Sequence, residues 1–235
     1  MSLDDLAASR GLPLHWHANG GAQALALAER VADLLSEALA QRGVASLALS
    51  GGRSPRAFLQ ALDQQELDWQ ALRITLVDER WVPETDPQSN AGMLRECMPN
   101  ALAAANWLPL YRGVSPSADA AAVSVDLQHW LPLDVVVLGM GSDGHCASLF
   151  PGQPGLQARL ASDSPSLCEA VAEPQGAARL TLTGSVLHAA RQSLLAIAGE
   201  EKYTCLCDAF VRQPTQAPVA AFLAPPLEIF YSPEG

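Results

Sequence analysis

The sequence DVVVLGMGSDGHCASLFPG, residues 134–152, contains the pattern that decides the fold. Its first part, 134–138, is an almost uninterrupted apolar run, which is typical of a strand buried on both faces of a sheet. The rest is rich in glycine and ends at Pro151 and Gly152, so it predicts a loop rather than a long helix after the strand. The stretch therefore indicates an α/β protein with a ligand-binding loop at one edge of its sheet.

The same alternation of strand and helix patterns extends along the chain in both directions. A long helix is expected to end at Gly43, and a second helix is expected to begin with Ser54 as N-cap and Pro55 in its first turn. We predict strands at 46–50, 73–78, 134–138, 179–183, 193–198 and 218–223, and helices at 20–42, 55–62, 90–98, from 184 and at 200–212.

This alternation predicts a mainly parallel, Rossmann-like sheet with helices on both faces. We find no repeat, linker or boundary in composition, so we expect residues 1–235 to form one domain. In such sheets ligands bind beyond the carboxyl ends of the strands, which makes the residues after each strand the candidates for function.

Composition limits the classes of function. Hydrophobic residues make up 49% of the chain and charged residues 17%, which favours a compact globule with a sizeable core. The 14 Lys and Arg against 25 Asp and Glu give a net charge of −11, so we expect binding to neither nucleic acid nor an anionic membrane. An anionic substrate would need cations concentrated at one place.

Cysteine usage and the N-terminus favour the cytoplasm. The five cysteines are odd in number and lack paired CxxC spacing, so we interpret them as reduced, buried side chains rather than zinc ligands. We find no signal-peptide pattern and no apolar run of about 18 residues. The cysteines are Cys97, Cys146, Cys168, Cys205 and Cys207.

Two motifs follow predicted strands in the first half of the chain. The first is SGGRSPRAF, residues 50–58, which places Ser50, Gly51, Gly52 and Arg53 before a helix. Exposed backbone N–H groups and a guanidinium at a helix start are suited to binding a phosphate. The alternative interpretation is an ordinary tight turn. In LVDERWVP, residues 76–83, three charged residues end a strand, which is either a solvated edge or a shaped loop.

In the shaped-loop interpretation of the second motif, Asp78 and Arg80 face a ligand. Asp78 would bond sugar hydroxyls or assist proton transfer, and Arg80 would bind phosphate.

The loop of the opening stretch contains a literal GxGxxG at Gly139, Gly141 and Gly144. We exclude a dinucleotide site, because the helix that should follow is cut short at Pro151 and no strand ending in an acid lies about 20 residues further on. Asp143 and His145 are two residues apart in this loop, so His145 is a candidate acid or base at the sheet edge.

Cations are scarce, yet several occur where strands begin or end. Arg179 opens one predicted strand and Lys202 follows another, and each taken alone could be a surface residue. Together with Arg53 and Arg80 they form the set that a phosphate site would require.

Taken together, SGGRSP, DERWVP, SN at 89–90, LGMGSDGHCASLFPG, RLTLT and GEEK occur in an order that resembles the 6-phosphogluconolactonase family across most of the chain. The resemblance implies a sugar-phosphate isomerase-like α/β fold and hydrolysis of 6-phospho-D-glucono-1,5-lactone to 6-phosphogluconate in the oxidative pentose phosphate pathway. It implies no metal or cofactor, and we expect a monomer.

The resemblance also implies roles for single residues. His145 is the base that activates water, with Asp143 and Asp78 beside it or near the substrate hydroxyls. The substrate and its phosphate would be held by Ser50, Gly51, Gly52, Arg53, Arg80, Asn90, Arg179 and Lys202.

Two other functions remain as alternatives. An amino-sugar phosphate isomerase/deaminase shares the fold and the GxDGH core, but a segment resembling IAFNEP follows its histidine, where this chain has CASLFPG. A non-catalytic, sugar-phosphate-binding regulatory domain of a transcription factor would need a DNA-binding segment, and none is apparent in this acidic sequence.

Overall fold

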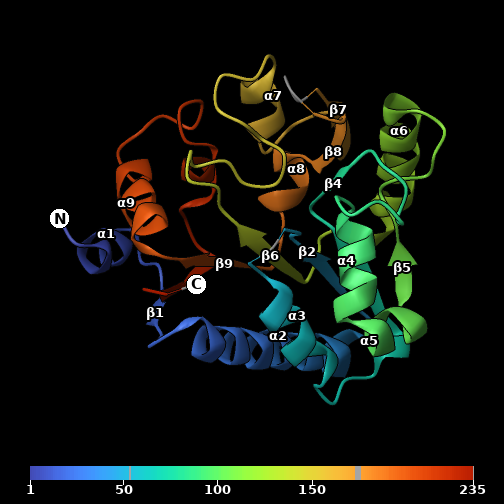
Figure 1. The fold of residues 1–235 in the computed structure, drawn as a ribbon, viewed down its shortest axis with the longest axis horizontal. Coiled ribbons are helices and arrows are strands. Elements are labelled where there is room, and N and C mark those ends of the chain that lie inside the picture. The colour runs from blue at the N-terminus through green and yellow to red at the C-terminus, as the bar shows by residue number, and fades with distance from the viewer. Residues whose placement is uncertain (53, 173–175, 235) are drawn as a thin grey trace.

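A parallel sheet forms the centre of the molecule. The structure, a computed structural model, describes residues 1–52, 54–172 and 176–234, and within these ranges seven strands pair in the order β1-β10-β9-β6-β2-β3-β5 (Figure 1). Every neighbouring pair is parallel, which confirms the predicted fold class. The strands are β1 (Leu14–Trp16), β2 (Ala45–Leu49), β3 (Leu72–Leu76), β5 (Asn106–Leu108), β6 (Val135–Gly139), β9 (Gln192–Ala198) and β10 (Leu227–Ser232).

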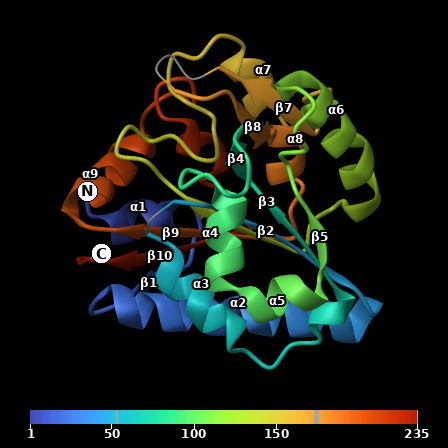
Figure 2. The ribbon, with the colours of Figure 1, turned by 45° about the vertical axis from the view of Figure 1, so that its right-hand side comes forward.

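Helices cover this sheet on both sides. In Figure 2, α2, α3 and α5 lie below the strands, and α9 lies above β9. Helix α2 has the predicted bounds, because Asn19 caps its first turn and Gly43, at φ +71°, ends it. The helices of the described residues are α1 (Leu3–Ser9), α2 (Gly20–Arg42), α3 (Arg56–Asp63), α4 (Asn90–Cys97), α5 (Pro99–Ala104), α6 (Pro116–Leu127), α7 (Leu156–Leu160), α8 (Gly184–Leu187) and α9 (Glu200–Ala209).

A second, antiparallel sheet corrects the prediction of a single strand at 73–78. Strand β3 ends at Leu76, and the chain then changes sheets at Val77, whose N–H donates to the Leu49 carbonyl of β2 while its own carbonyl accepts from Leu182 N–H. The sheet has the order β4-β8-β7, with β4 (Asp78–Arg80), β7 (Cys168–Val171) and β8 (Arg179–Leu182).

The register of the second sheet explains its importance for function. Strands β4 and β8 are antiparallel, and Arg80 lies opposite Arg179 while Asp78 lies opposite Thr181. The strand predicted at 179–183 is therefore real but belongs to this small sheet rather than to the central one. As a result, the two arginines are neighbours although they are far apart in the sequence.

The strand predicted at 218–223 is wrong, because Pro218–Phe222 is a 3₁₀ helix. Its N–H groups do not pair with a strand: Ala220 N–H donates to the nearby Ala217 carbonyl, and Val219 N–H donates to the distant Gly144 carbonyl in the loop after β6. The last strand is β10, which the sequence patterns did not indicate. Two further 3₁₀ helices lie at Trp69–Ala71 and Gln128–Trp130.

The helix starts and ends also differ from prediction in places. Pro55 rather than Ser54 is the N-cap of α3, because the first helical hydrogen bond runs from Leu59 N–H to the Pro55 carbonyl (2.9 Å). The helix expected from 184 has only four residues, and α9 ends at Ala209. None of the helices in the described part of the chain has the length and hydropathy needed to cross a lipid bilayer.

The cysteines are free, as predicted. Cys97, Cys146 and Cys168 are buried, whereas Cys205 and Cys207 on α9 are only half-buried. Cys146 directly follows His145, but burial raises the pKa of its thiol. Because the thiolate is the reactive form, Cys146 is not a candidate nucleophile.

Candidate active site

A pocket of about 610 Å³ opens at the carboxyl ends of β2, β6 and β9, the edge that the sequence predicted. Ser50, Gly139 and Ala198 line it where these three strands end. Its other walls come from the first turns of α2, α3 and α9, the start of the second sheet and the loop after β6. The polar and charged lining residues are Asn19, Gln23, Ser50, Ser54, Asp78, Arg80, Asn90, His145, Arg179, Lys202 and Glu234.

His145 is the imidazole of this pocket, and Asp143 holds it. The Nδ1 atom of His145 lies 2.6 Å from Asp143 Oδ1, and the same carboxylate oxygen accepts the His145 backbone N–H at 3.1 Å. Partial burial alone would raise the pKa of Asp143, but these hydrogen bonds hold it below the ordinary value. Asp143 therefore stays ionised and keeps the proton of a neutral His145 on Nδ1, which leaves Nε2 as the acceptor.

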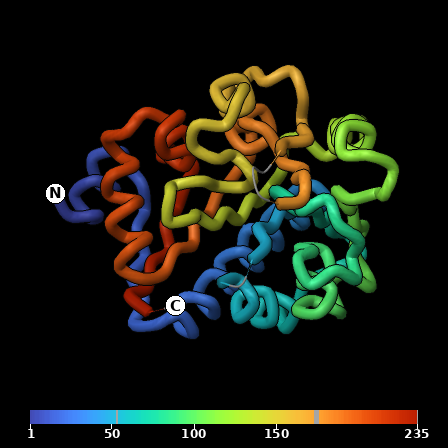
Figure 3. Tube along the Cα trace, turned by 45° about the horizontal axis from the view of Figure 1, so that its top comes forward, coloured from blue at the N-terminus to red at the C-terminus, as the bar shows by residue number. Residues whose placement is uncertain are grey.

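The loop that carries His145 is a closed turn built on glycine. Gly141 N–H donates to the His145 carbonyl, and Gly144, at φ +82°, donates to the Gly141 carbonyl. A Cβ atom added to Gly141 would overlap the His145 ring. In Figure 3 this yellow-green loop lies beside the orange-red helix α9, and Val219 N–H binds the Gly144 carbonyl from the segment after that helix (2.9 Å).

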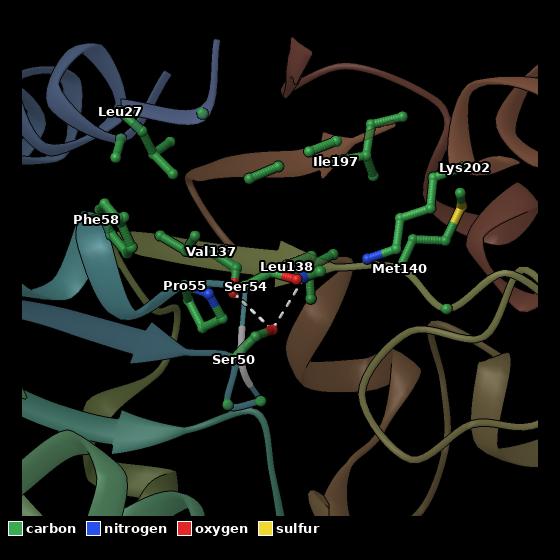
Figure 4. Close-up of a pocket in the computed structure, with 18 of the residues that line it drawn as sticks. Leu27, Ser50, Ser54, Pro55, Phe58, Val137, Leu138, Met140, Ile197 and Lys202 are labelled. Atoms are coloured by element: carbon green, nitrogen blue, oxygen red, sulfur yellow. Dashed lines mark hydrogen bonds between the residues drawn. The ribbon is translucent and has the colours of Figure 1, made fainter. Parts of the chain in front are cut away.

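The Ser50 to Gly52 turn forms the wall at the end of β2. Ser50 Oγ donates to the Val137 carbonyl (2.9 Å) and accepts Gly139 N–H (3.0 Å), so it joins the ends of β2 and β6, as the dashed lines in Figure 4 show. Gly52 has a φ of +98°. Arg53, which was predicted to bind phosphate, lies outside the described residues.

Asp78 is a buried carboxylate at the start of β4. Its Oδ2 atom accepts a hydrogen bond from Ser148 Oγ (2.6 Å) and lies 3.8 Å from Arg179 Nη1. The Arg179 guanidinium also stacks over the Phe150 ring, at 5.3 Å from its centroid, and Phe150 contacts the His145 ring. Asp78 thus orients a cation of the pocket and is linked through Arg179 and Phe150 to the His145 ring.

Arg80 and Asn90 form a second polar group in the wall. Arg80 Nη1 donates to Asn90 Oδ1, and Asn90 Nδ2 donates to the Asp78 carbonyl (2.9 Å). A Cβ atom on Gly51 would overlap the Asn90 side chain, so Asn90 packs directly against the Ser50 to Gly52 turn. The amide therefore connects strand β4 with the glycine turn.

Lys202 enters the pocket from the first turn of α9. Figure 4 shows its side chain extending from the helix toward the end of β6 near Leu138. Burial lowers the pKa of Lys202, against a smaller opposing effect of Glu201. Among the described residues, it joins Arg80 and Arg179 as the third cation that lines the pocket, in a chain of net charge −11, which favours an anionic ligand.

Comparison with known proteins agrees with this geometry. A family model described as glucosamine-6-phosphate isomerases/6-phosphogluconolactonase matches residues 19–228. The chain belongs to this family. It is 42% identical to the 6-phosphogluconolactonase of Pseudomonas aeruginosa over 99% of this chain and 100% of that protein, and 40% identical to that of Pseudomonas putida over 99% and 98%.

Solved structures of the family share the fold. A 6-phosphogluconolactonase from Shewanella baltica superposes with a TM-score of 0.89 at 33% identity, covering 94% of this chain and 97% of that one. A protein described as a putative 6-phosphogluconolactonase, from Neisseria gonorrhoeae, gives 0.83 at 36% identity, covering 94% and 99%. The fold that carries the pocket is therefore shared with solved structures of the family.

For this family member, the structure gathers most of the predicted site residues into one pocket. Asp143 does not line the pocket and instead lies behind His145, whose ring it orients. Arg53 lies outside the described residues. The predicted residues that line the pocket are Ser50, Gly51, Gly52, Asp78, Arg80, Asn90, His145, Arg179 and Lys202.

Some residues of the site were not singled out from the sequence. Asn19 and the glycines after it line the pocket at the first turn of α2, and the only local signal was an Asn before a long helix pattern. Ser148, which bonds Asp78, and Glu79, which is fully buried, had no signal of their own. Their partners become visible only in the folded chain.

Proposed function

We propose that this chain is a 6-phosphogluconolactonase, which hydrolyses 6-phospho-D-glucono-1,5-lactone to 6-phosphogluconate in the oxidative pentose phosphate pathway. One observation carries the proposal: His145, oriented by Asp143, shares a pocket with Arg80, Arg179 and Lys202. A base beside three cations suits a substrate with a hydrolysable ester at one end and a phosphate at the other. Relatives with this name cover nearly the whole chain.

His145 is the general base of the proposed mechanism. Its Nε2 takes a proton from a water molecule as the water oxygen attacks C1 of the lactone, and the carbonyl becomes a tetrahedral oxyanion. The oxyanion collapses, the bond from C1 to the ring oxygen breaks, and that oxygen takes up the proton that His145 holds. General-base assistance of this kind contributes about 10²–10⁴-fold.

Asp143 supports this cycle without touching the substrate. Its short hydrogen bond to Nδ1 fixes which ring nitrogen faces the water and stabilises the imidazolium that forms after the proton transfer. The lowered pKa of Asp143 keeps the carboxylate charged throughout.

The cations hold the phosphate and orient the lactone. Arg80, Arg179 and Lys202, with the backbone of the Ser50 to Gly52 turn and Arg53, bind the phosphate oxygens. Asp78 holds Arg179 and accepts a hydrogen bond from a sugar hydroxyl, and Asn90 fixes Arg80. Binding energy from the phosphate is thereby used to place C1 near His145.

The protein is proposed to act as a monomer in the cytoplasm, without nucleic acid. The free cysteines support a reducing compartment, and the net charge of −11 disfavours a nucleic-acid partner.

The test is an assay of acid release from freshly generated 6-phosphogluconolactone by the purified, chelator-treated protein. We expect hydrolysis well above the spontaneous rate. A rate no faster than the buffer control would contradict the proposal. Ammonia release from glucosamine 6-phosphate would instead assign the chain to the isomerase/deaminase branch of its family, and binding without turnover would favour a regulatory sugar-phosphate domain.

A further inference from the structure

Glu79 lies between two residues of the proposed substrate site, but it does not line the pocket itself. It follows Asp78 and precedes Arg80 on β4, and its side chain is 0% exposed. Burying a carboxylate is costly unless hydrogen bonds replace its water. The hydrogen bonds around the Glu79 carboxylate must therefore compensate for its burial.

Four neutral donors surround the Glu79 carboxylate, two at each oxygen. Oε1 accepts the backbone N–H groups of Arg80 and Asn90, both at 2.8 Å. Oε2 accepts the backbone N–H of Ala91 at 2.7 Å and the hydroxyl of Ser89 at 3.1 Å. Burial raises the pKa of Glu79, and these backbone hydrogen bonds oppose the shift.

Two of these donors belong to residues that shape the pocket. Glu79 fixes the backbone of Arg80 directly, and it fixes the backbone of Asn90 at the first turn of α4. The Asn90 side chain then bonds the Arg80 guanidinium and the Asp78 carbonyl and packs against Gly51. One buried carboxylate thus joins β4, α4 and the glycine turn after β2.

We infer that Glu79 is a positioning residue for substrate binding, because its carboxylate holds Arg80 and Asn90 where they face the phosphate of the substrate. The inference rests on the proposed function. It adds to that function a residue that never touches the ligand and acts through two residues that do.

The variant Glu79→Gln tests this role because an amide cannot replace the carboxylate here. Whichever side the Gln NH₂ group takes, it faces donors: Arg80 and Asn90 N–H on one side, or Ala91 N–H and Ser89 Oγ on the other. Only the hydroxyl can turn to accept a hydrogen bond. The backbone of β4 or α4 must therefore shift.

The loss of negative charge in Glu79→Gln would by itself change KM in the opposite direction. Removing a buried negative charge beside Arg80 would strengthen the attraction of the site for a phosphate. A lower KM in Glu79→Gln would therefore indicate an effect of charge alone. A higher KM indicates that positioning outweighs charge.

The experiment measures kcat and KM for 6-phosphogluconolactone together with thermal unfolding. We expect Glu79→Gln to raise KM about tenfold, on the scale of one lost charge-assisted hydrogen bond, with kcat changed less than about threefold. The affinity for 6-phosphogluconate, measured by calorimetry, should fall by a similar factor.

Asp63 provides a matched control. It is also a buried carboxylate that binds the first turn of another helix: from the end of α3 it accepts Ala101 N–H (2.8 Å) and Asn100 Nδ2 (2.9 Å) of α5, but it does not line the pocket. Asp63→Asn should lower the Tm without changing KM. If Glu79→Gln behaved in the same way, or lowered KM, Glu79 would be a structural cap and the inference would be overturned.

A milder variant decides the question if Glu79→Gln does not fold. Ser89→Ala removes one of the four donors together with the N-cap bond from Gly92 N–H, and we expect KM to rise about twofold to fivefold. A lower Tm with unchanged KM in Ser89→Ala would overturn the inference. If the wild-type protein does not hydrolyse the lactone, the proposed function and the inference are overturned together. If the wild-type protein is active and the variants have the same KM as the wild type, only the inference is overturned.

Discussion

At the scale of single residues, the proposed chemistry depends on how His145 and Asp143 share one proton. Asp143 Oδ1 accepts both the backbone N–H and the ring of His145, so the ring has little freedom to rotate. Phe150 contacts the imidazole on another side, with ring centroids 4.5 Å apart. Nε2 is thereby left as the nitrogen that can accept a proton from water in the pocket.

His145→Ala should lower kcat about 10²–10⁴-fold while substrate binding is retained, because it removes the proposed base and leaves the cations in place. Steady-state kinetics with the lactone would measure the effect. Lys202→Met is the contrasting variant: it removes a cation from the same pocket, so it should raise KM and leave kcat nearly unchanged. Wild-type kcat in His145→Ala would show that another group is the base.

At the scale of elements, the site depends on the backbone conformation of the loop after β6, which requires glycine at Gly141 and Gly144. Gly144 adopts φ +82°, and Ala147, two residues after His145, adopts φ +49°, which is uncommon for a residue with a side chain. The Gly144 carbonyl is bound by the segment after α9. The loop is thus held in place by an element far along the chain as well as by its own turn.

Gly141→Ala should lower kcat at least about tenfold with little loss of stability, since the new methyl group would overlap only side-chain atoms, those of the His145 ring and the Asp143 carboxylate, and would force the ring out of its hydrogen-bonded position. Kinetics and thermal unfolding of the single and double variants would check this. The double variant with Gly141→Ala and His145→Ala should have the same kcat as His145→Ala alone. An additive loss would mean that Gly141 acts on the site independently of His145.

At the scale of the whole molecule, an ion pair ties the edge of the main sheet to the helix beneath it. Glu228 of β10 is 7% exposed and lies 2.6 Å from Arg30 Nη2 of α2 and 3.1 Å from His15 Nε2 of β1. Burial would raise the pKa of Glu228, but the hydrogen bonds and charges of Arg30 and His15 lower it overall. A lowered pKa in the folded state contributes stability above the unfolded value, which is lost as the pH falls through the folded one.

Glu228→Gln should therefore lower the free energy of unfolding by about 1–3 kcal/mol at pH 7. The difference from wild type should shrink as the pH falls below about 4.3, the ordinary value for glutamate. Denaturant unfolding at pH 7, 5 and 3.5 would measure it. A difference that stayed constant over this range would show that packing, rather than charge, is lost.

Local patterns were sufficient for much of the fold and site. Helix α2, strand β2 and strand β6 were predicted to within one residue, because periodicity and terminal glycines act over a few positions. Strand β10 was missed, and 218–223 was assigned as a strand instead, because the N–H groups that decide between strand and turn bond to distant residues such as Gly144.

The sequence by itself determined the alternation of strands and helices, the glycine loop and the pairing of His145 with Asp143, since these depend on neighbours along the chain. Only the tertiary structure decided that Asp78 leaves the main sheet for a second one, where Ser148, 70 residues away, bonds its carboxylate. It also decided that Arg80 lies opposite Arg179 and that Glu79 is buried. These contacts depend on which sheet each short strand joins. At Val77, the backbone hydrogen bonds to Leu49 and Leu182 direct the chain from the main sheet into the second one.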